Sequence, residues 1–217
     1  MSIADNLAVI RAALPPTVTL VAVSKTRPAS IVAEALTAGH VDFGENYAQE
    51  LRDKADELGP GPRWHFIGSL QRNKVKYVVG RAILIHDVDS IELAEEIGKR
   101  SGSTPTAILV GVNMGELQKS GVPTARALEF ARALMRVPGV SLRGLMTIPP
   151  ATEDPAAAAP YFAELAALAA VGRADGLPLH ELSMGMSHDW AVAIAHGATL
   201  VRVGTAIFGA RRPITET

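Results

Sequence analysis

The sequence contains no cysteine among its 217 residues. This absence excludes disulfide bonds, thiolate metal sites and a cysteine nucleophile. The six histidines show no paired helical spacing of the His-Glu-x-x-His kind, so we expect no metal site. Because a chain without disulfides fits a reducing compartment, we predict a cytoplasmic protein.

An excess of charge of one sign is also lacking. Lysine and arginine number 21 against 22 aspartate and glutamate residues, which gives a formal net charge of −1. This balance gives no reason to expect nucleic acid or an anionic membrane as a partner. The most apolar stretch, residues 156–171, is rich in alanine and contains Glu164. We predict that it is too short and too weakly hydrophobic to span a membrane.

Apolar residues make up 48% of the chain, which is enough to build one large hydrophobic core. No shift in composition and no long linker divides the sequence, so we predict a single domain over residues 1–217. Ile3, Leu7 and Ile10 recur at helical spacing, which predicts an amphipathic helix at the N-terminus.

Short apolar runs typical of strands alternate along the rest of the chain with segments of helical periodicity, which predicts parallel pairing with right-handed crossovers. An open doubly wound sheet usually has about five or six strands, so the eight predicted here favour a closed α/β fold, the (β/α)8 TIM barrel. The one long loop, residues 149–160, has the composition of a mobile cover over the barrel mouth. The predicted strands cover residues 20–24, 41–44, 63–68, 82–88, 106–113, 141–148, 179–184 and 199–204; the predicted helices cover 31–38, 48–58, 75–79, 91–99, 125–135, 161–171 and 190–196.

Lys25 stands where the first predicted strand ends, directly after the apolar run TLVAVS. The carboxyl ends of barrel strands share one mouth, and ligands bind there. The alternative is a lysine that merely extends from a strand end into water. Further polar residues stand at or near the ends of the other strands: Asn46, His65, Asp87, Asp89, Asn113, Thr147, Ser183 and Arg202.

Arg202 is the most informative of these residues because it lies inside the apolar run TLVRVG. A guanidinium in a barrel strand is costly unless it has a hydrogen-bond acceptor. The acceptor could be a ligand at the mouth of the barrel. The alternative is a salt bridge with a carboxylate on a neighbouring strand.

Two stretches near the C-terminus suit the binding of phosphate. In SMGMSHDW, residues 183–190, the glycine permits close backbone approach, and Ser187 is placed to cap a helix whose free N–H groups would face an anion. Gly204 and Thr205 follow the last predicted strand. Barrels often bind phosphate between the loops after strands seven and eight, which is where both stretches fall. The alternative for Ser187 is an ordinary helix cap.

A lysine able to form a Schiff base, an arginine placed for a ring nitrogen and a phosphate site in one barrel mouth describe a pyridoxal 5′-phosphate (PLP) site. The motifs LVAVSKT, FGENYAQE, WHFIGSLQRNK, RGLMTI, LSMGMSHDW and VRVGTAIFGAR occur in this order between residues 18 and 211. In these motifs the sequence closely resembles the pyridoxal phosphate homeostasis protein family, single-domain relatives of the alanine racemase N-terminal barrel. We find no role for two family-like stretches, the motif at residues 64–74 and residues 115–121. Barrel packing is the alternative for His65 and Ile67, and a solvated loop for Glu116 and Lys119.

The resemblance implies a role for each candidate residue of the site. Lys25 would form the Schiff base with PLP, and Arg202 would face the pyridine nitrogen. Ser183 would be a further neighbour of the phosphate. The phosphate would be bound by Ser187, Gly204 and Thr205. The ring pocket would be lined by Asn46 and Met146.

Arginine opposite the ring nitrogen remains a cation, so the nitrogen stays unprotonated and the ring is a weak electron sink. The sequence ends about a dozen residues after the last predicted strand, which leaves no second domain to supply a second base. We therefore expect a monomeric PLP-binding protein, not an enzyme, that buffers PLP or delivers it to PLP-dependent apoenzymes, with other B6 vitamers as further partners. The alternatives are a weak amino acid racemase or other PLP enzyme that uses Lys25 alone, and a Schiff-base aldolase acting on a sugar phosphate. Racemisation at the rate of a metabolic enzyme would point to a second base, for which Tyr47, His65 and His188 are the first candidates.

Overall fold

The apolar runs predicted as strands all form strands, and these strands close into a barrel. The computed structural model describes residues 2–115 and 120–209. The first strand, β1 (Thr19–Val23), pairs with β2 (Asp42–Glu45) on one side and with β9 (Leu200–Val203) on the other. Pairing between β4 (Ala82–Val88) and β5 (Thr106–Asn113) closes the ring of eight parallel strands. The other members are β3 (Arg63–Phe66), β7 (Val140–Met146) and β8 (Glu181–Met186).

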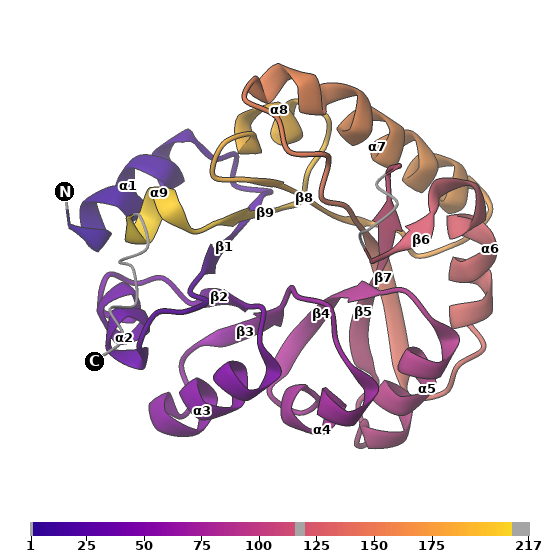
Figure 1. Cartoon of the computed structure of the whole chain (residues 1–217), viewed down its shortest axis with the longest axis horizontal. Coiled ribbons are helices and arrows are strands. Elements are labelled where there is room, and N and C mark those ends of the chain that lie inside the picture. Colours follow the sequence, from indigo (N-terminus) through magenta and orange to yellow (C-terminus); the bar gives the residue numbers. More distant parts are fainter. Residues whose placement is uncertain (1, 116–119, 210–217) are drawn as a thin grey trace.

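Helices form an outer ring around the strands, as Figure 1 shows. This is the (β/α)8 barrel that the sequence predicted, with a helix added before the first strand. The helices are α1 (Ile3–Ala13), α2 (Ala29–Thr37), α3 (Ala48–Leu58), α4 (Val75–Val78), α5 (Ile91–Arg100), α6 (Thr124–Leu134), α7 (Ala159–Ala174), α8 (Trp190–Ala195) and α9 (Thr205–Phe208), with 3₁₀ turns η1 (Arg72–Lys74) and η2 (Pro155–Ala158).

Four short elements were not predicted, because they are too short to show a period in the sequence. They are η1, η2, α9 and the two-residue strand β6 (Val122–Pro123), which pairs with β5. The prediction of a loop over residues 149–160 was wrong in its second half, where η2 runs directly into α7. The predicted loop around Glu116 and Lys119, and the last two residues of the final motif, lie outside the described residues.

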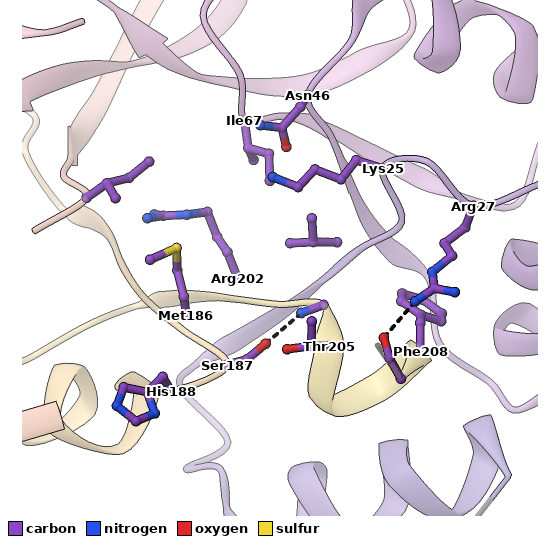
Figure 2. A pocket seen from close by; sticks show the side chains of 14 residues that line it. Lys25, Arg27, Asn46, Ile67, Met186, Ser187, His188, Arg202, Thr205 and Phe208 are labelled. Carbon is purple, nitrogen blue, oxygen red and sulfur yellow. Dashed lines mark hydrogen bonds between the residues drawn. The ribbon is translucent and has the colours of Figure 1, made fainter. Parts of the chain in front are cut away.

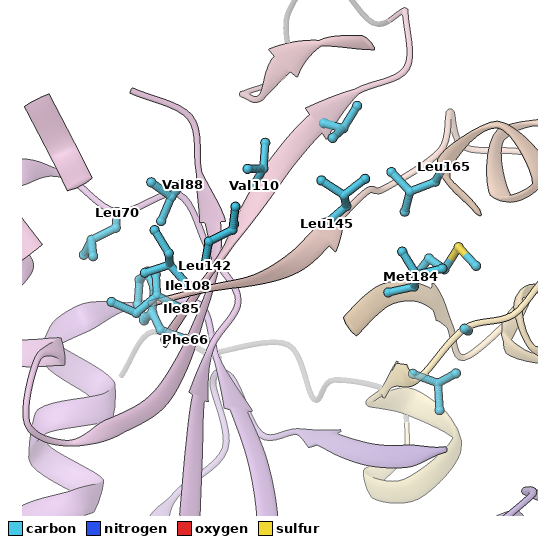
Figure 3. Close-up of a cluster of buried hydrophobic side chains, with 14 of the residues drawn as sticks. Phe66, Leu70, Ile85, Val88, Ile108, Val110, Leu142, Leu145, Leu165 and Met184 are labelled. Atoms are coloured by element: carbon cyan, nitrogen blue, oxygen red, sulfur yellow. The ribbon is translucent and has the colours of Figure 1, made fainter. Parts of the chain in front are cut away.

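The barrel separates two groups of buried apolar side chains. A small cluster of Val21, Leu84, Leu109, Met146 and Leu200 comes from five different strands. A much larger cluster joins strands and helices, and Figure 3 shows part of it, with Phe66, Ile85, Ile108, Leu145 and Leu165. Because successive side chains of a strand point to opposite faces, the two clusters occupy opposite faces of the sheet.

Helix α1 supports the end of the chain that follows β9. Ser2 caps it and forms a reciprocal capping box with Asp5. The Asn6 side chain donates a hydrogen bond of 2.8 Å to the carbonyl oxygen of Ile207 in α9. The two helices lie side by side in Figure 1. The added N-terminal helix therefore fixes α9 after the last barrel strand.

The segment Pro155–Ala174 is the one helical stretch in the described parts of the chain that is long and apolar enough to cross a membrane, with a mean hydropathy of 1.2 over its most apolar window. The expectation that this region is too short and too weakly hydrophobic was wrong on both counts, because η2 and α7 together make 20 residues and their most apolar window reaches this hydropathy. Phe162, Leu165 and Ala169 are fully buried on one face of α7, which contacts β7 and β8. An outer helix of a barrel passes the same test of length and composition, so the segment is weak evidence for a membrane span.

Candidate functional site

Six of the eight predicted site residues line one cavity of about 280 Å³ at the carboxyl ends of the strands. Lys25 lies in the turn directly after β1, and its side chain extends into this cavity in Figure 2. The sequence argument that strand ends would converge at one mouth therefore holds for most of the set. The six residues are Lys25, Asn46, Ser187, Arg202, Gly204 and Thr205.

The cavity carries positive charge. Its lining includes Lys25, Arg27 and Arg202, and no aspartate or glutamate lies among the described residues that line it. Arg27 donates a hydrogen bond of 2.6 Å to the carbonyl oxygen of Gly209. The apolar part of the wall consists of Val23, Ile67, Ile148, Met186 and Phe208. A cavity with three cations and an apolar wall suits an anionic ligand with a flat hydrophobic body.

The two predicted phosphate stretches do meet, although not in the way the sequence suggested. The Gly204 backbone N–H donates a hydrogen bond of 3.1 Å to Ser187 Oγ, which joins the loop after β8 to the loop after β9. Ser187 does not cap a helix, because α8 begins at Trp190 and Asp189 is its N-cap residue. Gly185 has a φ of +89°, and a Cβ there would lie 2.6 Å from the Cβ of Ala193 in α8. The close approach that this glycine permits is therefore between β8 and α8.

Arg202 is buried inside the barrel and reaches two oxygen acceptors. Its Nη1 donates to Ser183 Oγ at 2.6 Å, and its Nη2 donates to the carbonyl oxygen of Thr147 at 2.9 Å. No carboxylate of the described residues forms a salt bridge with it, so the alternative of a neighbouring ion pair is wrong. Burial lowers the pKa of Arg202 to about 10, with Asp189 and Asp87 acting in the opposite direction. The guanidinium therefore remains a cation at neutral pH.

A chain of buried side chains continues from Arg202 across the barrel interior. Ser183 Oγ lies 2.8 Å from His86 Nδ1, and His86 Nε2 lies 3.0 Å from His65 Nδ1. His65 Nε2 in turn lies 3.2 Å from a carboxylate oxygen of Asp42. The structure thus places Ser183 behind Arg202 and outside the lining of the Lys25 cavity.

Asp42, at one end of this chain of side chains, fixes the proton on the histidine next to it. Burial acts to raise the pKa of Asp42, but hydrogen bonds from His65 and Arg63 outweigh burial and hold that pKa below its usual value. Asp42 is therefore an acceptor, and His65 must donate to it from Nε2. Burial lowers the pKa of His86 well below its usual value, so His86 is neutral. His65 Nδ1 and His86 Nε2 share one hydrogen bond, and the remaining nitrogen of His86 is bonded to the Ser183 hydroxyl.

We predict that Ser183→Ala lowers the free energy of unfolding by about 1–3 kcal/mol, because it leaves His86 Nδ1 and one Arg202 N–H buried without a partner. Urea denaturation of the variant and of Ser103→Ala, an exposed serine, measures the difference. If the free energy of unfolding falls no further than in Ser103→Ala, the buried chain of side chains does not support Arg202.

Met146, the eighth candidate, lines a second cavity of about 170 Å³. Asn46, Ile67 and Ile148 line both cavities, so the two adjoin. Asp87 also lines the second cavity, where burial raises its pKa to about 6 against the hydrogen bond that Ser120 donates to it. Most of the predicted strand-end residues are accounted for by one of the two cavities or by the buried chain.

Sequence reasoning missed several residues of the Lys25 cavity. Arg27 was not among the candidates for the site, although its position two residues after Lys25 places it in the same turn. Phe208 lies in α9, which was not predicted. Of the three candidates for a second base, only His188 lines the cavity. Tyr47 is 57% exposed and lies outside it, and His65 belongs to the buried chain.

Comparison with known proteins gives consistent matches over almost the whole chain. Residues 1–212 match the family model of the alanine racemase N-terminal domain. The chain is 43% identical over 198 residues to a pyridoxal phosphate homeostasis protein of Aquifex aeolicus, covering 89% of this chain and 87% of that protein. It is 42% identical over 227 residues to the protein of the same name in Escherichia coli, with 96% and 97% covered.

A solved structure shows the same fold with a ligand. PipY of Synechococcus elongatus, with PLP bound, superimposes with a TM-score of 0.88 at 40% identity, covering 96% of this chain and 100% of that chain. The relatives are named for PLP homeostasis and not for a reaction. The chain therefore belongs to the alanine racemase N-terminal domain family and, within it, to the pyridoxal phosphate homeostasis proteins.

Proposed function

We propose that this protein is a cytoplasmic PLP carrier, a single barrel domain that binds PLP through Lys25 and releases it again. The observation that carries the proposal is the charge of the Lys25 cavity, which is lined by three cations and by no carboxylate of the described residues. PLP is a flat ring with a phosphate dianion, so both its charge and its apolar body match this lining. The PLP bound in PipY supports the same conclusion.

The residues present fit the group. The Lys25 amine would condense with the aldehyde of PLP and release one water molecule, while Arg202 would donate to the ring nitrogen. Asn46 has a buried Oδ1 with no hydrogen-bond partner among the described residues, which leaves an acceptor at the edge of the ring pocket beside Met146. We assign Ser183 to the support of Arg202 and not to the phosphate. The phosphate contacts are proposed for Ser187, Gly204 and Thr205, which share the loops after β8 and β9.

The arrangement favours a carrier over a catalyst. When bound, PLP supplies an aldehyde that exchanges between amines, and catalysis of proton transfer would need the ring to accept electrons. Arg202 is a fixed cation that can only donate, so it opposes protonation of the ring nitrogen. Beside Lys25, the described lining of the cavity offers His188 as a base, and its Nε2 lies 2.8 Å from the carbonyl oxygen of Glu153. We propose that the monomer exchanges PLP and other B6 vitamers with apoenzymes.

The carrier and racemase hypotheses make opposite predictions for the protein saturated with PLP. We expect negligible racemisation of alanine in a chiral assay, because a well-placed acid–base group is worth about 10²–10⁴ in rate, and His188, the further base on the described lining, is hydrogen-bonded to the carbonyl oxygen of Glu153. We expect the same preparation to restore the activity of a PLP-dependent apoenzyme when the two are mixed. Racemisation at the rate of a metabolic enzyme, or retention of all PLP in the presence of the apoenzyme, would contradict the carrier hypothesis.

A further inference from the structure

A buried ion cluster lies behind Lys25 and contributes nothing to the lining of its cavity. Lys54 Nζ, on α3, lies 2.6 Å from Glu45 Oε1 at the end of β2. Both side chains are almost completely buried, with 6% and 0% of their surface exposed. Ser24 is attached to the cluster twice, because its Oγ donates to Glu45 Oε1 at 2.6 Å and its carbonyl oxygen accepts from Lys54 Nζ at 2.7 Å. The residue before Lys25 is thus fixed through both its side chain and its backbone.

The residue after Lys25 is held by the same cluster. Glu50 Oε1 accepts a hydrogen bond of 2.7 Å from Lys54 Nζ and another of 2.6 Å from the backbone N–H of Thr26. Thr26 has a φ of +62° and is the one non-glycine residue with positive φ in the described parts of the chain. A β-branched residue in this left-handed region is a conformational outlier that the surroundings must impose.

Burying this cluster costs free energy, and a barrel does not need it for packing. Taking the Glu45 carboxylate and the Lys54 ammonium out of water costs more than an apolar substitute of the same volume, and in some proteins such buried pairs are retained because they specify a geometry. Burial raises the pKa of Glu45 to about 7 in spite of its contacts with Lys54 and Ser24. The geometry specified here is that of the turn that carries Lys25, because the cluster joins β2 and α3 to Ser24 and Thr26, the two neighbours of Lys25 in the sequence.

We propose that Lys54 is a positioning residue for Lys25: by holding Glu45 and Glu50 together it fixes Ser24 and Thr26, and so directs the Lys25 amine into the cavity. The proposal rests on the proposed binding of PLP by Lys25. It concerns a lysine outside the cavity that touches neither the ligand nor the reacting atoms.

The test compares Lys54→Met, which keeps an apolar side chain of similar length, with Lys99→Met, which removes an exposed lysine from α5. PLP is mixed with each protein at a temperature where circular dichroism shows both to be folded, and capture is followed by the visible absorbance of the lysine adduct. We expect Lys54→Met to slow capture and weaken affinity for PLP roughly 10- to 100-fold, as expected when a reacting group is misplaced by about 1 Å. After borohydride reduction, the share of label on Lys25 should fall in favour of surface lysines. Lys99→Met should match the unmodified protein.

The outcomes separate this inference from the proposed function. If the unmodified protein itself shows no visible band with PLP, the proposed function fails. If it shows the band and Lys54→Met captures PLP at the same rate, with the same affinity and the same labelling pattern, the positioning role is wrong. Should Lys54→Met not fold, Glu50→Ala gives the same reading, because Glu50 is only half buried and its removal frees the Thr26 N–H. Unchanged capture in Glu50→Ala would overturn the proposal equally.

Discussion

Lys25→Ala is expected to abolish covalent binding of PLP while leaving the barrel folded. The side chain lies in the turn after β1, lines the cavity and forms no part of the two buried apolar clusters. Its removal therefore costs the core little, and the cavity loses the one lysine on its described lining. The visible absorbance band on addition of PLP should be absent, and circular dichroism should give an unchanged spectrum.

Lys99→Ala is the matched control, because it removes an exposed lysine from the end of α5. It should bind PLP as the unmodified protein does. A Lys25→Ala variant that keeps the visible band would show that another lysine forms the bond. A variant that unfolds would show that Lys25 holds the barrel together and would remove the support for its role in binding.

Pyridoxal, which lacks the phosphate, is expected to bind roughly 10²–10⁴-fold more weakly than PLP. Two charge-assisted hydrogen bonds to the phosphate would be worth about 1.5–3 kcal/mol each, and every 1.4 kcal/mol is a factor of ten in affinity. We expect these two bonds to come from Ser187 Oγ and the Thr205 backbone N–H, while the Gly204 N–H already donates to Ser187 Oγ and holds that hydroxyl beside Thr205. Spectroscopic titration with each vitamer measures the ratio.

A serine variant localises this effect to the loops after β8 and β9. Ser187→Ala should weaken PLP by about tenfold and leave pyridoxal unchanged, whereas Ser103→Ala should change neither. Equal affinities for PLP and pyridoxal in the unmodified protein would mean that these loops do not hold the phosphate. If Ser187→Ala lowers the affinity for PLP and for pyridoxal equally, the serine contributes to the shape of the cavity and does not bind the phosphate.

The barrel could be predicted because its strands are local apolar runs. Each run is eight residues long or shorter, and its own residues show the apolar pattern of a buried strand. The alternation of these runs with helices restricts the topology to parallel pairing. Lys25, Ser187 and Gly204 could be brought together in the same way, since strand ends of a barrel share a mouth. What the pattern could not supply was the detail of α9, whose four residues are too few for a helical period.

The partners of individual side chains were harder to predict, because they come from distant strands. Arg202 was expected to need an acceptor, and it has two, but Ser183 and Thr147 are neutral oxygens and not the carboxylate considered as the alternative. His86 was not singled out at all. The sequence did contain an indication of its place, because His86 stands two residues after Leu84. This spacing puts both side chains on the inward face of β4, where His86 lies beside His65.

Ser187 shows where a local rule failed. A serine shortly before a helix is a good candidate for its cap, yet α8 begins two residues too late for Ser187, and Asp189 is the N-cap residue. The Ser187 hydroxyl accepts a hydrogen bond from the backbone of Gly204, directly after β9, and this contact depends on the pairing of β8 with β9. The residue stayed in the site while its local role changed.

Borohydride reduction of the protein in the presence of PLP, followed by peptide mass mapping, tests the central claim most directly. Reduction makes the bond between lysine and PLP permanent, so the labelled peptide identifies the lysine. We predict about one phosphopyridoxyl group per chain, on the peptide that contains Lys25. Label on Lys74, or spread evenly over exposed lysines with none on Lys25, would contradict the assignment of the PLP site to the mouth of this barrel.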